Sequence, residues 1–252
     1  MVSMEQEFTI DMNGLGIHAK IDFPKEKKEK MPLVLLCHGL TGHMEEWHIW
    51  GIRDSITDCG YICLRIELYG HGKTDGAFYD HDLEKWVEEI CFCIDYAKSL
   101  PFVSDVVLAG HSQGGLATIM TAGVAGEKLK AIIPLSPALN IPVDCRRGDF
   151  FGTIFDPEDL PETVTFWESN DLGRNYFEVA QKIDTTEAIR NYTGPVLLVH
   201  GGDDGAVPCK YSVEAAKEFP QATLALLDGD GHCYEHHLDL AKEAVETFLR
   251  SL

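Results

Sequence analysis

Short apolar runs alternate with longer amphipathic stretches along most of this chain, and this alternation constrains the fold more than any other feature. Residues 33–37, 106–109 and 131–135 are continuous apolar runs, typical of parallel strands that are buried on both faces. Residues 83–100 carry apolar side chains at helical spacing, and Pro101 ends that stretch. The pattern predicts an α/β protein with an open, doubly wound and mostly parallel sheet.

The remaining segments extend this pattern and interrupt it once. Two alternating stretches flank Asn13-Gly14, a pair that favours a hairpin turn. The alternation stops between residues 138 and 190, which are too few for a comfortable core of their own. We therefore expect one domain over residues 1–252, with residues 138–190 inserted as a cap before the last two strands. The other expected strands cover residues 5–11, 16–22, 61–66, 195–199 and 223–227, and the other helices cover residues 47–59, 113–125, 210–219 and 238–249.

Charge and composition argue against several classes of function. The chain has 21 Lys and Arg against 41 Asp and Glu, and its net charge of −20 repels phosphate backbones and anionic lipid. We therefore expect no nucleic-acid and no membrane partner. No run approaches the ~18 apolar residues of a membrane span, and residues 1–7 lack the features of a signal peptide. The eight scattered cysteines have no zinc-site spacing, so we expect reduced thiols, a cytoplasmic location, no metal and no cofactor.

A nucleophile motif lies near the centre of the chain. Gly110-His111-Ser112-Gln113-Gly114 follows an apolar strand and opens a helix, which is the context in which G-x-S-x-G forms a nucleophile elbow. Ser112 is the expected nucleophile, and the alternative is a serine in a Gly-rich packing turn. The backbone N–H of Gln113 at the start of the helix is expected to stabilise a developing oxyanion.

A general base and an orienting acid are expected after the nucleophile, in the order Ser, Asp, His. Asp203 and Asp204 follow one predicted strand and His232 follows the next, so all lie at carboxyl ends of strands, where such sheets place their sites. We predict Asp204 as the acid because it lies at the turn of Asp-x-x-Val-Pro, and Asp203 stays open as the alternative. His232 is preferred to His236 and His237, which begin the final helix.

The loop after the first central strand is expected to complete the site. In His38-Gly39-Leu40-Thr41-Gly42, the N–H of Leu40 is the second predicted oxyanion donor. We expect His38 to hold this loop by hydrogen bonds and to take no part as a base. Together these residues predict serine hydrolase chemistry on an ester through an acyl-enzyme.

These motifs resemble those of the α/β-hydrolase superfamily across essentially the whole chain, and more closely those of bacterial feruloyl (cinnamoyl) esterases. The resemblance implies an α/β-hydrolase fold and a cap whose acidic residue and tyrosine bind the phenolic hydroxyls of a hydroxycinnamoyl ring. The matching positions here are Asp144 and Tyr176. The supporting sequences beyond those quoted are Tyr69-Gly70-His71-Gly72-Lys73-Thr74-Asp75-Gly76, Gly152-Thr153-Ile154-Phe155-Asp156-Pro157, Leu172-Gly173-Arg174-Asn175-Tyr176-Phe177 and Asp230-Gly231-His232-Cys233-Tyr234.

Three functions stay open at this point. The resemblance implies a serine esterase acting on small hydroxycinnamate (feruloyl, caffeoyl or coumaroyl) esters. A general short-acyl carboxylesterase or monoacylglycerol-lipase-like hydrolase is the alternative, although the many charges of the insertion argue against long acyl chains. A non-catalytic ligand receptor of the same fold is the third. The oligomeric state is open, with a homodimer as the candidate because closed symmetric dimers are common. Candidate pocket walls, which equally fit the core of the insertion, are Phe150, Phe155, Phe166 and Trp167.

Overall fold

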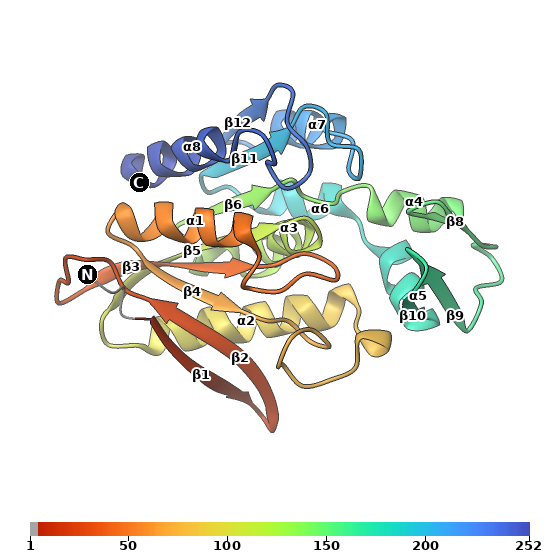
Figure 1. Ribbon diagram of the computed structural model, residues 1–252, viewed down its shortest axis with the longest axis horizontal. Coiled ribbons are helices and arrows are strands. Elements are labelled where there is room, and N and C mark those ends of the chain that lie inside the picture. The colour runs from red at the N-terminus through yellow and green to blue at the C-terminus, as the bar shows by residue number, and fades with distance from the viewer. Residues whose placement is uncertain (1–4) are drawn as a thin grey trace.

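An eight-stranded sheet forms the centre of the computed structural model, which describes residues 5–252 (Figure 1). Its strand order is β1-β2-β4-β3-β5-β6-β11-β12. The first pair and the β2–β4 pair are antiparallel, and all other neighbours are parallel, which confirms the predicted mostly parallel sheet. The bounds are β1 (Glu5–Met12), β2 (Leu15–Asp22), β3 (Met31–Cys37), β4 (Ile62–Ile66), β5 (Val103–His111), β6 (Ala131–Leu135), β11 (Val196–Gly201) and β12 (Ala222–Leu227).

Helices cover both faces of this sheet. The main helices are α1 (Trp47–Asp58), α2 (Leu83–Ser99), α3 (Gln113–Ala125), α7 (Lys210–Glu218) and α8 (Leu238–Ser251), with short 3₁₀ turns η1 (Phe78–Asp80) and η2 (Gly126–Lys128). Helices α1 and α8 pack together on one face, and α2 and α3 pack on the other. Among residues 5–252, no helix combines the length and the apolar character that crossing a lipid bilayer requires.

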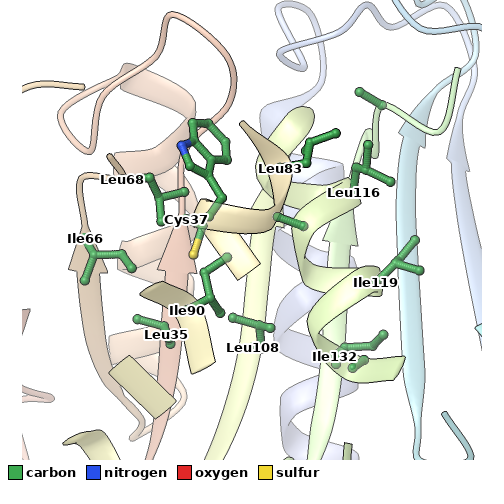
Figure 2. Close-up of a cluster of buried hydrophobic side chains, with 14 of the residues drawn as sticks. Leu35, Cys37, Ile66, Leu68, Leu83, Ile90, Leu108, Leu116, Ile119 and Ile132 are labelled. Carbon is green, nitrogen blue, oxygen red and sulfur yellow. The ribbon is translucent and has the colours of Figure 1, made fainter. Parts of the chain in front are cut away.

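The core follows the two-residue period of the strands. In β3, Leu35 and Cys37 point into the cluster under α2 and α3, while Val34 and Leu36 point into the cluster under α1 and α8. Figure 2 shows the first cluster, with Ile90 and other side chains of α2 and α3 packed against side chains of the central strands. A strand that is apolar on both faces is thus buried on both faces.

The segment between β6 and β11 holds seven elements: α4 (Ile141–Arg147), β7 (Asp149–Phe150), β8 (Thr153–Ile154), β9 (Thr163–Phe166), β10 (Asn170–Gly173), α5 (Arg174–Lys182) and α6 (Thr185–Asn191). Elements α4 to α5 gather beyond the end of the sheet to which β3 and β4 point (Figure 1). Helix α6 instead packs against α3. Buried aromatic side chains of the cap, Phe150 and Phe166 among them, belong to the same cluster as the core of the sheet.

Candidate active site

The turn between β5 and α3 holds Ser112 in a strained backbone conformation. Its φ of 56° and ψ of −119° are rarely adopted by residues other than glycine. A Cβ atom at Gly110 would lie 2.3 Å from the carbonyl oxygen of Gly114, and one at Gly114 would lie 2.2 Å from that of His38. The two glycines therefore allow the close packing that raises Ser112 above the strand ends.

The substitution Gly114→Ala is expected to lower the free energy of unfolding by about 3 kcal/mol, because its Cβ would collide with backbone that cannot give way. Urea unfolding followed by circular dichroism measures this. The matched control is Gly205→Ala, whose Cβ would enter open space and which should leave stability unchanged or slightly higher. Equal stabilities of the two variants would contradict the packing argument.

Asp204 and His232 form a close pair across the loops after β11 and β12. Nδ1 of His232 lies 2.6 Å from Oδ2 of Asp204, and the N–H groups of Ala206 and Val207 donate to Oδ1. The side chain of Asp204 is fully buried, whereas Asp203 is exposed. Burial opposes ionisation of Asp204, but hydrogen bonds from His200, His232 and Val207 outweigh it and hold its pKa well below the ordinary value.

His232 lies next to the nucleophile turn. Its carbonyl oxygen is 2.9 Å from Nε2 of His111, the residue before Ser112, and the two imidazole rings are 4.7 Å apart between centroids. No hydrogen bond joins Ser112 and His232 side chains within residues 5–252; such contacts are often long before substrate binds. Ser112, His232 and Asp204 are thus gathered at one edge of the sheet, while His236 and His237 are exposed.

The two predicted oxyanion donors flank Ser112. A Cβ at Gly39 would lie 2.9 Å from Cβ of Ser112, so the loop after β3 runs directly beside the nucleophile. The N–H of Leu40 follows in that loop, and the N–H of Gln113 lies in the first turn of α3, where helix amides have no intrahelical partner. His38 holds the loop, since its Nδ1 contacts the Gly39 carbonyl at 2.7 Å and its Nε2 accepts the N–H of Leu68.

Sequence reasoning missed His200, which is a second imidazole partner of Asp204. Its Nε2 lies 3.1 Å from Oδ2 of Asp204 and 3.0 Å from the carbonyl oxygen of Val207. Its Nδ1 lies 2.7 Å from Oγ of Ser212. Because Nε2 faces two oxygens, we assign the proton to Nε2, and Nδ1 accepts from the Ser212 hydroxyl. The available signal was a histidine at a strand end, four residues before the predicted acid.

The substitution His200→Leu is expected to lower kcat/KM about tenfold, because the carboxylate of Asp204 loses one of the hydrogen bonds that hold it against His232. Initial rates of ester hydrolysis measure the loss. His200→Gln, which keeps an amide donor, should restore much of the rate, and an unchanged kcat/KM in His200→Leu would rule out a positioning role for His200.

The two predicted ring-binding residues lie in different surroundings. Asp144 in α4 is half-buried, accepts a hydrogen bond from Nδ2 of Asn140 at 2.8 Å, and has its pKa raised by burial. Tyr176 in α5 is fully buried, and its hydroxyl donates to Oε1 of Gln113 at 2.7 Å. The structure therefore does not bring Tyr176 to the same surface as Asp144.

A cavity of about 510 Å³ lies between the cap and the loop that carries Asp204. Trp167 lines it and is 49% exposed, whereas Phe150 and Phe166 are core residues. Sequence reasoning missed Phe151 as a wall of this cavity. Its backbone has a φ of 48°, a local turn that the spacing of apolar residues does not indicate. The full lining is Asn140, Asp144, Asp149, Phe151, Gly152, Trp167, Gly205, Ala206 and Pro208.

Comparisons with known proteins agree with this architecture. A solved structure of Est1E from Butyrivibrio proteoclasticus with bound ferulic acid superposes with a TM-score of 0.95 and 45% identity, covering 97% of this chain and 98% of that one. A second Est1E structure has a TM-score of 0.92 and 42% identity over the same shares. These matches confirm the resemblance and the α/β-hydrolase fold.

Curated relatives are more distant. The human mitochondrial palmitoyl-protein thioesterase ABHD10 is 23% identical over 201 residues, which are 76% of this chain and 63% of the relative, so this chain spans less than two thirds of that protein. A non-heme chloroperoxidase of Kitasatospora aureofaciens is 25% identical, over 83% of this chain and 88% of the relative. The model of the alpha/beta hydrolase family matches residues 34–246. The chain therefore belongs to the alpha/beta hydrolase family.

Proposed function

We propose that this protein is a carboxylic ester hydrolase that uses Ser112 as its nucleophile and cleaves hydroxycinnamate esters. The observation that carries the reaction type is the strained Ser112 turn beside the buried Asp204–His232 pair. The support for the substrate class is the 45% identity to a relative whose solved structure holds ferulic acid.

The proposed reaction begins when His232 takes the proton of Ser112 and the Ser112 oxygen attacks the ester carbonyl. The N–H groups of Leu40 and Gln113 stabilise the oxyanion that develops. His232 then protonates the leaving alcohol, and water repeats the cycle on the acyl-enzyme. Asp204, ionised and hydrogen-bonded to Nδ1 of His232, keeps the imidazole oriented and stabilises its charged form.

The cavity between the cap and the loop that carries Asp204 offers a ring both aromatic and polar contacts. Trp167 and Phe151 lie with ring centroids 4.9 Å apart and provide an aromatic wall. Asp144 and Asn140 provide polar groups on the same lining, and a carboxylate oxygen is a suitable acceptor for a phenolic O–H. We propose Asp144 as the contact to the ring hydroxyl. Tyr176 also stays a proposed ring-binding residue, and its buried hydroxyl contacts Gln113 beside the Ser112 turn.

Initial rates on four esters test the proposal: methyl ferulate, methyl caffeate, chlorogenate and 4-nitrophenyl butyrate, each with wild type and Ser112→Ala. We expect strong turnover of the three hydroxycinnamates that Ser112→Ala abolishes. Turnover of the butyrate ester alone would favour the general short-acyl esterase. No Ser112-dependent turnover of any ester would overturn the proposal and favour the non-catalytic receptor.

Asp144→Ala is expected to lower kcat/KM for methyl ferulate about tenfold or more, because a hydrogen bond from the phenol to a charged acceptor is lost. The rate on 4-nitrophenyl butyrate, which has no such hydroxyl in its acyl group, should stay within about twofold. Asp156→Ala, an exposed acid elsewhere in the cap, is the control and should change neither rate. Equal losses on both substrates in Asp144→Ala would indicate a purely structural role.

A further inference from the structure

A cluster of potential metal ligands lies behind the loop that carries His232. It consists of His48 near the start of α1, His111 at the end of β5, and Cys233. One ligand atom from each lies within 4.8 Å of the others. A carboxylate is also at hand, since Oε2 of Glu46 lies 3.9 Å from Nε2 of His48. The three residues come from distant parts of the chain, so no spacing in the sequence indicates a metal site.

The burial of His48 without a hydrogen-bond partner is what a bound ion would explain. His48 is 2% exposed, and neither of its ring nitrogens has a hydrogen-bond partner among the described residues. Leaving such a group unsatisfied is unfavourable, and buried polar atoms without partners point to a missing water or ion. His111 differs, because its Nε2 contacts the carbonyl oxygen of His232 at 2.9 Å.

We propose that His48, His111 and Cys233 bind a zinc ion, with Glu46 as the fourth ligand, and that the bound ion inhibits the enzyme. Two imidazoles and a thiolate are ligands that favour Zn²⁺ over Mg²⁺ or Ca²⁺, which take oxygen ligands. Tetrahedral zinc places its ligand atoms about 3.5 Å apart, so movements of about 1 Å, that of the Cys233 backbone included, complete the site. Cys233 is partly exposed, which gives the ion a route in, and its thiol proton passes to solvent on binding.

The inhibitory role follows from the position of the cluster and rests on the proposed function. Cys233 is the residue after His232, and His111 contacts the carbonyl of His232. An ion that draws Cys233 toward His48 therefore moves the backbone of His232 against Ser112 and Asp204. A displacement of about 1 Å at a catalytic base is enough to lower kcat by tenfold or more.

Cobalt absorption spectroscopy on untagged, chelator-treated protein tests the site without any activity measurement. We expect one equivalent of Co²⁺ to bind, with a thiolate-to-cobalt charge-transfer band that Zn²⁺ abolishes by displacement. The band should be lost in Cys233→Ser, and Co²⁺ affinity should fall about tenfold or more in His48→Gln. Cys91→Ser and His236→Gln, a partly buried thiol and an exposed histidine outside the cluster, are the controls and should bind as wild type does.

Different results would overturn the site and the inhibitory role. A charge-transfer band that persists in Cys233→Ser, or no saturable binding by wild type, would remove the site. Zinc binding without a fall in kcat, or equal inhibition of wild type and Cys233→Ser, would remove the inhibitory role. If wild type hydrolyses none of the four esters, the proposed function fails while the cobalt measurement still decides the site.

Discussion

Replacing Ser112 by alanine is expected to lower kcat for ester hydrolysis about 10⁴- to 10⁶-fold, because no other group at the turn can form the acyl-enzyme. The proposed oxyanion donors Leu40 and Gln113 stay in place, so a small rate above that of water should persist. Initial rates on methyl ferulate and 4-nitrophenyl butyrate measure the loss. A variant within a hundredfold of wild type would show that Ser112 is not the nucleophile.

A second variant separates the chemistry of this turn from its strain. Ser112→Gly removes the hydroxyl as Ser112→Ala does, but glycine adopts a φ of 56° and a ψ of −119° more readily. We expect both variants to lose activity to a similar extent and the glycine variant to be more stable by about 1 kcal/mol, in thermal or urea unfolding. The opposite order of stabilities would mean that the turn is not strained.

Asp204→Asn is expected to lower kcat about 10⁴-fold, because an amide at this position favours the wrong tautomer of His232. The control is Asp203→Asn, which changes the same charge one residue earlier on an exposed side chain and should stay within about twofold of wild type. This pair decides between the two acids that the sequence left open. Similar losses in both variants would contradict the assignment to Asp204.

The same aspartate should make stability depend on pH in a defined direction. The pKa of Asp204 is held below its ordinary value because hydrogen bonds from His200 and His232 outweigh the opposing effect of burial. A pKa that is lower in the folded state than in the unfolded state stabilises the protein. This contribution to the free energy of unfolding is fully present above the unfolded pKa of about 4, and it is lost as pH falls toward the folded value. Urea unfolding should therefore show Asp204→Asn furthest below wild type at neutral pH, with the gap narrowing below about pH 4.

Features set by local sequence were predictable. Helix α3 spans the predicted residues 113–125, because a nucleophile elbow joins strand to helix within a few residues. The hairpin at Asn13-Gly14 likewise follows from two residues that both adopt positive φ, at 55° and 94°. The choice of Asp204 over Asp203 as the partner of His232 rested on the turn position within one short motif, and in the structure Asp204 lies 2.6 Å from Nδ1 of His232.

Features set by packing between distant segments were not predictable. His200 contacts Asp204 only because the loop folds back over the end of β11, and His48 meets Cys233 only when α1 lies against the loop after β12. Tyr176 illustrates the same limit, because its motif did not show that the side chain is fully buried with its hydroxyl on Gln113. A single sequence does not show which apolar faces of its helices and strands pack against each other.

The hydrogen bond from Tyr176 to Gln113 ties the cap to the catalytic turn. The aromatic side chains of the cap also belong to the main core. Moving the cap away from the sheet as a rigid body would therefore break packing contacts of that core. Amide exchange should accordingly be as slow in α5 as in α3. Under the proposed function, selectivity would be altered most simply at Trp167 and Phe151 in the cavity lining, whereas a change near Tyr176 would also affect Gln113, the proposed oxyanion donor.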